Sequence, residues 1–151
     1  MTVRSLIFFT IVSFAAACGS SDAPEDIDKA RNESSKEMTT IQWLDSSRDF
    51  GNITMGQKLS VSFRFKNSGS KPLVIQSVHP ACGCTVADYP KEPIAPGAEG
   101  EITGEFNSEG REGQNHKEIT VYTNTAAHTH KLEFNVNVIG KAQQQTEVPA
   151  N

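Results

Sequence analysis

The sequence has no long apolar run in its interior and no cluster of basic residues. A membrane-spanning helix needs about 20 consecutive apolar residues, and the one strongly apolar stretch lies at the extreme N-terminus. Lys and Arg total 14 against 18 acidic residues, which gives a formal net charge of −4. Because a nucleic-acid surface needs clustered Lys and Arg, we expect no nucleic-acid partner.

Motifs of common catalytic sites are missing as well. The sequence contains neither a Gly-x-Ser-x-Gly elbow for a nucleophilic serine nor a Gly-x-x-x-x-Gly-Lys phosphate loop. Its densest acidic stretch, from Glu99 to Glu112, covers one expected strand and the flanking turns, which is typical of a solvated surface. We therefore expect a protein that is not an enzyme.

Cysteine is scarce, with three residues in the chain, and the first follows a signal-like segment. Arg4, an apolar stretch and three alanines precede Cys18, in the order of a secretory signal. Small residues before a cysteine also resemble the lipobox of bacterial lipoproteins, although Ala15 stands where Leu is usual. We expect a signal peptide over residues 1–17, a lipid on Cys18, and export to the cell envelope with anchoring in a membrane. The alternative is an ordinary cut after Ala17 that leaves Cys18 as a free thiol.

Residues 18–39 are mostly polar and acidic, and their larger apolar side chains are Ile27 and Met38. Such a segment buries too little apolar surface to offset its ordering entropy. We expect a flexible acidic tether, with which a transient helix within 27–37 is compatible. Residues 141–151 have no pattern and are expected to form a disordered tail.

Alternation of apolar and polar residues marks the part from residue 40 to 140. Leu59–Lys66 and Lys131–Val138 show it most clearly, and similar segments are Leu73–Val78, Glu101–Phe106 and Glu118–Tyr122. Thr40–Leu44 and Phe50–Thr54 add one or two edge strands. About seven short strands separated by Gly- and Pro-containing turns predict an all-β fold, an immunoglobulin-like antiparallel β-sandwich. A small barrel is the competing all-β solution.

Several short motifs occur together within this domain. They are Phe50-Gly51, Gly56, Phe63–Gly69, Pro72–Ile75, Cys82-Gly83-Cys84-Thr85, Pro96-Gly97 and Ile119–Asn124. In combination they resemble domain of unknown function 1573, a family of small immunoglobulin-like domains often found in exported lipoproteins of Bacteroidetes-type bacteria. The resemblance covers roughly Phe50 to Val138. It implies the fold and brings no established activity with it.

The central segment holds the best candidates for special chemistry. With Cys18 lipidated, Cys82 and Cys84 remain as a pair in an oxidising compartment. They can form a disulfide, for which Gly83 permits the bend, and so short a loop favours a labile bond. Alternatively, the two thiolates and His79 are suitable ligands for Cu or Zn. The simplest interpretation is a structural role where the chain leaves a strand.

The following segment is rich in proline and predicts a rigid exposed loop. Together with Thr85 it supplies the expected contact residues, which are Thr85, Tyr89, Pro90, Pro93 and Pro96. The leading hypothesis is a lipid-anchored, non-catalytic binding or structural module without a cofactor, whose partner is an envelope protein or ligand. The alternative hypothesis is a periplasmic metal-binding (Cu or Zn) or thiol-redox protein that uses the Cys-Gly-Cys loop.

Overall fold

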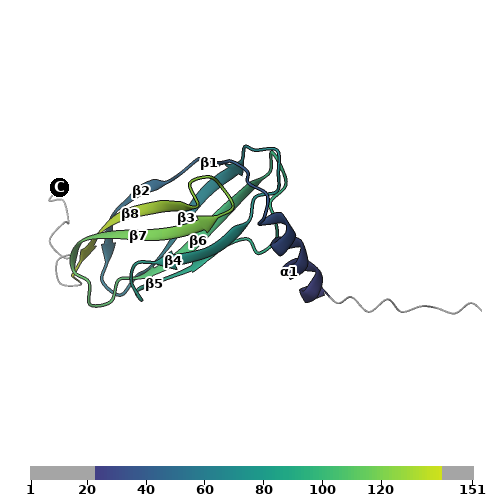
Figure 1. Ribbon diagram of the computed structural model, residues 1–151. Helices are drawn as coiled ribbons and strands as arrows, with labels where there is room; N and C mark the ends of the chain where they lie inside the picture. Colours follow the sequence, from purple (N-terminus) through teal and green to yellow (C-terminus); the bar gives the residue numbers. More distant parts are fainter. Residues whose placement is uncertain (1–22, 141–151) are drawn as a thin grey trace, which may run out of the picture.

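Two four-stranded β-sheets pack face to face, with one helix at an end of the sandwich (Figure 1). The computed structural model describes residues 23–140. Its elements are α1 (Ala23–Ser34), β1 (Ile41–Trp43), β2 (Ser47–Thr54), β3 (Lys58–Asn67), β4 (Ile75–Pro80), β5 (Thr85–Asp88), β6 (Glu99–Asn107), β7 (Gly113–Thr123) and β8 (Thr129–Ile139). The expected signal peptide, Cys18 and the C-terminal tail lie outside the described residues. Within residues 23–140, no helix has the length and apolar content needed to cross a membrane.

The strand order confirms the predicted β-sandwich. One sheet has the order β1-β3-β6-β5 and the other β2-β8-β7-β4, which corresponds to the ABED and CFG sheets of constant-type immunoglobulin domains with one strand added. Most neighbours are antiparallel, but β2 runs parallel to β8, from Ser47 opposite Glu133 to Thr54 opposite Ile139. The segment just before β3 thus contributes an edge strand to each sheet.

Alternating residues of the strands fill the space between the sheets. In β3, Val61, Phe63 and Phe65 are at most 2% exposed, and the residues between them face outward. Phe134 of β8 lies in the same core, with its ring centroid 5.8 Å from that of Phe106. Burying one such side chain contributes about 1.5 to 3 kcal/mol, so this apolar layer is the main source of stability.

The positions of two strands differ from the sequence prediction. β4 begins at Ile75, because Leu73 pairs instead with Ile94 through backbone hydrogen bonds of 2.9 and 2.8 Å. β5 was not predicted at all. Its four residues pair with β6 from Thr85 opposite Phe106 to Asp88 opposite Thr103. The domain therefore has eight strands where about seven were expected.

Residues 23–34 form a helix where a flexible tether was expected. The last carbonyls of a helix have no hydrogen-bond partners within the helix. Here a side chain of the sandwich supplies a donor. The Asn124 side-chain amide donates to the carbonyl oxygens of Ser34 at 3.1 Å and Glu37 at 2.8 Å. Polar contacts of this kind, rather than apolar burial, hold the segment in place.

Candidate functional site

The chain crosses from one sheet to the other at the Cys-Gly-Cys segment. β4 is an edge strand of its sheet and ends at Pro80, while β5 is an edge strand of the other sheet and begins at Thr85. A disulfide joins Cys82 to Cys84 within this crossing, and their Cα atoms are 5.2 Å apart. We call residues 81–85 the disulfide corner.

Gly83 does not adopt the conformation that would require glycine. It is absent from the positive-φ glycines of the described chain, and a Cβ atom placed on it would meet nothing within 4 Å. The bend between the cysteines therefore does not depend on the lack of a side chain. What the glycine provides is open space beside the disulfide.

The two sulfurs have different surroundings. Cys84 is 6% exposed and belongs to the core, whereas Cys82 is half-buried at its border. The hydroxyl of Thr85 lies 3.8 Å from Cys82 Sγ and 3.9 Å from Cys84 Sγ. Because disulfide sulfurs carry no hydrogen, the hydroxyl is the donor, and the two sulfurs share its single hydrogen.

His79 is not assembled with the cysteines. It is exposed on β4, where its Nε2 lies 3.2 Å from Ser77 Oγ and its ring contacts that of Tyr122 at a centroid distance of 5.6 Å. Among residues 23–140, no three His, Cys, Asp or Glu side chains form a group that could hold a metal ion. The proposed ligand set of Cys82, Cys84 and His79 is thus not brought together, and its sulfurs are bonded to each other.

The proline-rich loop is in contact with α1. The guanidinium of Arg31 donates to the carbonyl oxygen of Lys91 at 3.0 Å, of Ile75 at 2.8 Å and of Gln76 at 3.1 Å. Tyr89 lies beneath two cations, with Lys91 Nζ 3.1 Å from its ring centroid and the Arg31 guanidinium carbon 6.0 Å away. The predicted contact residue Tyr89 therefore binds groups of the same chain.

The prolines of this loop differ in accessibility. Pro90 and Pro93 are half-buried, and Pro93 lines a small cavity with Ile27 of α1. Pro96 is exposed in the turn that leads into β6. Ile94, between them, is buried in the core. The loop is thus fixed on both sides, and Pro96 is its most open predicted contact residue.

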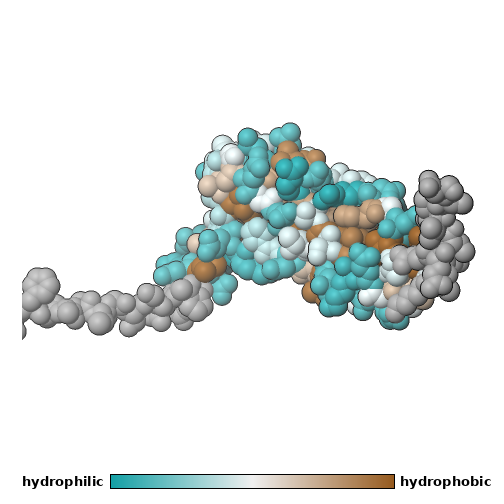
Figure 2. Space-filling view, turned by 180° about the vertical axis from the view of Figure 1, so that it is seen from behind, coloured by the Kyte–Doolittle hydropathy of each residue, from teal (hydrophilic) through white to brown (hydrophobic). Residues whose placement is uncertain are grey.

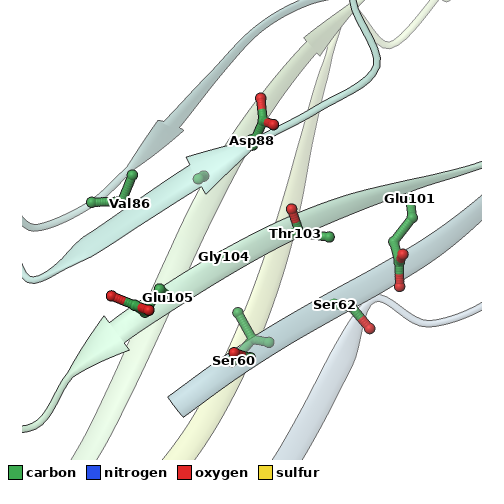
Figure 3. A pocket seen from close by; sticks show the side chains of 10 residues that line it. Ser60, Ser62, Val86, Asp88, Glu101, Thr103, Gly104 and Glu105 are labelled. Carbon is green, nitrogen blue, oxygen red and sulfur yellow. The ribbon is translucent and has the colours of Figure 1, made fainter. Parts of the chain in front are cut away.

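A shallow groove of about 620 Å³ lies on the outer face of the β1-β3-β6-β5 sheet. In Figure 3, β6 runs along the groove with Thr103 and Glu105, between Ser60 and Ser62 of β3 and Val86 and Asp88 of β5. Small side chains in paired positions, such as Ser62 opposite Thr103, leave the hollow. We call this surface the outer-face groove.

Carboxylates and hydroxyls dominate the groove. Glu105 pairs with Lys58 at 2.8 Å, which raises the pKa of that lysine. The backbone N–H of Tyr89 and the ammonium of Lys91 lower the pKa of Asp88 below its ordinary value. Val86, at 72% exposed, is the groove's large apolar side chain. The groove lining includes neither His nor Cys, and its polar side chains are hydroxyls and carboxylates.

Sequence reasoning missed Arg31 and the roles of two buried asparagines. The Asn67 amide donates to the carbonyls of Lys71 at 2.8 Å and Ile94 at 2.9 Å, which ties β3 to the proline-rich loop. Asn124 in the same way connects Val74, directly before β4, to the end of α1. Asn followed by Ser-Gly is a turn signal, but the distant carbonyls that it binds cannot be read from the sequence.

The motifs of the domain can now be compared with known proteins. A family model described as a protein of unknown function, DUF1573, matches residues 41–138. The chain belongs to this family. The match spans β1 to β8 and includes the disulfide corner and the outer-face groove. No curated protein matches the sequence.

Solved structures of other proteins have a similar fold. A protein of unknown function from Porphyromonas gingivalis W83 has a TM-score of 0.59 at 17% identity, over 67% of this chain and 47% of that one. The ASH or PapD-like domain 7 of human CEP192 has a TM-score of 0.53 at 12% identity, over 68% and 87%. The YadV chaperone has a TM-score of 0.50 at 17% identity, over 66% and 52%. At these identities the likeness concerns the fold alone. The chain spans about half of the first and third structures.

Proposed function

We propose that this DUF1573 protein is a lipid-anchored, non-catalytic binding module of the cell envelope, and that the outer-face groove receives its partner. The observation that carries the proposal is the groove itself, which is hollow, open and lined by acceptor oxygens of Ser62, Asp88, Glu101 and Thr103. These exposed hydroxyls and carboxylates are groups to which a partner can form hydrogen bonds.

The lining also indicates the chemistry of the partner. Ser60, Ser62 and Thr103 present hydroxyls, while Glu101 adds a carboxylate at the rim. Carboxylates accept and do not donate hydrogen bonds, so a complementary surface carries N–H donors. The exposed Val86 adds an apolar contact at the β5 side. An envelope protein presenting an amide- or lysine-rich segment matches these features.

The face seen in Figure 2 is mostly hydrophilic, with hydrophobic residues in separate smaller areas. The proline-rich loop gives a weaker case for binding than the groove does. This loop, expected to be the contact region, has the carbonyl of Lys91 and the ring of Tyr89 in contact with Arg31. Fold likeness to a PapD-like domain and a chaperone supports a binding role by association only.

Cross-linking in cells tests the groove. A photoreactive residue replacing Thr103 should give a discrete cross-linked product, and Thr103→Arg, which fills the hollow, should compete poorly for the same partner. The control position is His116, which is exposed on β7 of the opposite sheet. Equal products from both positions, or products only from the Tyr89–Pro96 loop, would contradict the groove as binding surface.

The anchor rests on the sequence around Cys18 and has its own test. Mass spectrometry of the native protein should find Cys18 as the N-terminal residue, carrying acyl chains. More than one chain is needed for stable anchoring. An intact Met1 or an unmodified Cys18 at the N-terminus would refute the lipid anchor without affecting the groove.

A second function, thiol–disulfide exchange, is favoured by one observation, the half-buried position of Cys82 at an open corner. Metal binding by the same cysteines would first require reduction of their bond. It would also require a third ligand, and His79 is engaged with Ser77 and Tyr122.

A further inference from the structure

The disulfide corner is held by the sheets on both sides. The N–H of Ala81 donates to the carbonyl of Glu118 at 2.9 Å, and the N–H of Asn107 donates to the carbonyl of Cys84 at 2.9 Å. These bonds tie the two ends of the corner to β7 and β6. A disulfide between residues two apart closes a very short loop and adds little loop-closure entropy. Stabilisation of the fold is therefore not the main role of this disulfide.

Access to the disulfide is one-sided. Cys84 Sγ belongs to a residue that is 6% exposed, whereas Cys82 is half-buried. The position where a side chain on residue 83 would stand is open space. An incoming thiolate must approach the sulfur it attacks. Cys82 is thus the sulfur that a thiol from solvent can reach, and Cys84 is the sulfur that leaves.

The Thr85 hydroxyl is placed to stabilise the sulfur that leaves. Thr85 is 6% exposed, and its hydroxyl has the two sulfurs as its hydrogen-bond partners in the described structure. Hydrogen bonds to ionised groups are stronger than those to neutral ones. In the disulfide, Cys84 Sγ lies 3.9 Å from the hydroxyl and is a weak acceptor. When the disulfide opens, this sulfur becomes a thiolate, which is a stronger acceptor. The hydroxyl therefore favours the open state and the path to it.

We propose that Cys82–Cys84 is a thiol–disulfide exchange site that oxidises exposed dithiols, with Thr85 as the donor to the leaving thiolate. A substrate thiolate attacks Cys82 Sγ, the bond between the cysteines breaks, and Cys84 Sγ takes the electron pair and then a proton. The second substrate thiolate attacks the substrate sulfur of the mixed disulfide and releases Cys82 as a thiolate. The substrate loses two electrons and the Cys82–Cys84 bond gains them. This activity is independent of the groove, so either can fail without the other.

The first experiment asks whether the native protein exchanges. In a Cys18→Ala background, the pair supplies the remaining thiols of the three-cysteine chain. Millimolar dithiothreitol, a dithiol probe, should reduce the pair while circular dichroism stays native, and the melting temperature should fall by no more than about 10 °C. Reduction that occurs only in denaturant, or reduction that unfolds the domain, would overturn the proposal.

The second experiment tests which sulfur is attacked. In Cys84→Ser the free thiol is that of Cys82, and in Cys82→Ser it is that of Cys84. Iodoacetamide should label the Cys82 thiol at least about tenfold faster, because alkylation depends on the exposure of the thiolate. Brief treatment of the oxidised protein with glutathione should leave the mixed disulfide on Cys82. Equal labelling rates, or glutathione on Cys84, would refute the assigned direction.

The third experiment separates the Thr85 hydroxyl from a structural role. Thr85→Val keeps the volume and removes the donor, and it should slow disulfide opening by glutathione about three- to tenfold, since the leaving thiolate loses its hydrogen bond. Thr85→Ser restores the hydroxyl and should restore the rate. If both variants are native by circular dichroism and exchange at the same rate, the hydroxyl has no part in the reaction.

Gly83 gives a steric control. Gly83→Phe places a ring in open space without backbone strain, so the domain should remain folded. The ring should slow oxidation of a protein dithiol such as reduced thioredoxin more than that of dithiothreitol, and Gly83→Ala should slow neither. Unchanged oxidation of thioredoxin by a folded Gly83→Phe variant would contradict approach from this side.

Discussion

Asn124 is buried directly after β7, and its side chain binds the backbone of two segments, residues 72–74 and the end of α1. Its Oδ1 accepts from the N–H of Val74 at 2.8 Å, while its amide donates to Pro72 and to the end of α1. An unpaired buried polar group costs about 1 to 3 kcal/mol. This one side chain therefore holds together residues 72–74, the end of β7 and the helix.

Replacing Asn124 with Leu should lower the free energy of unfolding by about 3 kcal/mol, because several buried backbone groups lose their partner together. Urea denaturation followed by circular dichroism measures the change. Asn32→Ala, at an exposed helix position, is the matched control and should change stability by less than about 0.5 kcal/mol. A similar small effect for Asn124→Leu would contradict the role assigned to Asn124.

His130 makes stability depend on pH. Burial lowers its pKa below the ordinary value of 6.5, and Nε2 lies 3.0 Å from the hydroxyl of Thr125. The folded state thus binds the proton less readily than the unfolded chain does. The contribution of His130 to the free energy of unfolding is present above pH 6.5. It is lost as the pH falls from 6.5 through the lower pKa that His130 has in the folded state.

The melting temperature of the native protein should therefore fall between about pH 7.5 and pH 5.5, and His130→Gln should show a smaller fall. Differential scanning calorimetry at the two pH values is the measurement. The lowered pKa of Asp88 acts in a separate window below 3.8, so it does not contribute. An equal fall in both proteins would assign the pH dependence to other groups.

Helix α1 is docked chiefly by polar contacts. Arg31 reaches three carbonyl oxygens with its planar guanidinium, a geometry that a lysine cannot reproduce. Arg31→Ala should release the helix while leaving the sandwich folded. Amide hydrogen exchange should rise by at least about tenfold in residues 23–37 and stay unchanged in β3 and β8. Lys29→Ala, exposed on the same helix, is the control and should leave exchange in residues 23–37 slow.

The inner face of β6 is shaped by glycine. A Cβ atom on Gly100 would lie 2.5 Å from Cζ of Phe65, a ring in the core. Gly100→Ala should therefore displace that ring and cost about 1 to 3 kcal/mol in the free energy of unfolding, measured in urea. Gly83→Ala meets no atom within 4 Å and should cost less than about 0.5 kcal/mol. Equal free energies of unfolding for the two variants would show that the inner face of β6 can accommodate the added methyl group.

Elements with a long alternating pattern could be predicted, whereas those made by distant contacts could not. Leu59–Lys66 lies within β3 and Lys131–Val138 within β8, because one face of each strand is buried. β5 has four residues, of which Val86 is exposed and Ala87 is small, so its pattern is too short to stand out. Docking of α1 depends on carbonyls that the fold brings to Arg31 from β4 and the proline-rich loop.

The candidate site could be predicted in part. The sequence left a disulfide, a metal site and a structural role open for Cys82 and Cys84, and in the structure the two are joined by a disulfide. The sequence did not indicate that His79 points to Ser77 and Tyr122, because side-chain neighbours across strands depend on register. The outer-face groove combines residues of β3, β5 and β6, and β5 was not among the predicted strands.

Helix α1 and the end of β8 lie at opposite ends of the sandwich (Figure 1). Ala23, where α1 begins, follows Cys18 by five residues (23 − 18), a distance of at most about 18 Å. With a lipid on Cys18, the docked helix therefore keeps its end of the sandwich close to the membrane. The turn at Ser70 lies near this end, since neighbouring Lys71 pairs with Glu37.

Depth-dependent quenching on vesicles tests this orientation. In the lipidated protein, a fluorophore on Ser70→Cys should be quenched by brominated lipid more strongly than one on Glu109→Cys, which is an exposed site at the far end. Adding Arg31→Ala should reduce the difference by at least about half, because the sandwich then turns freely on its tether. Equal quenching at both sites with Arg31 present would contradict a fixed orientation.

The parallel pairing of β2 with β8 sets the order in which the domain can be completed. β2 leaves the ribosome early, yet its partner strand is the last of the domain. Until β8 has been synthesised, one edge of β7 stays open and Phe134 is missing from the core. Pairing over such sequence distance is slow. A chain that has not yet made β8 cannot close its second sheet, so the domain is completed as one unit once its last strand is available.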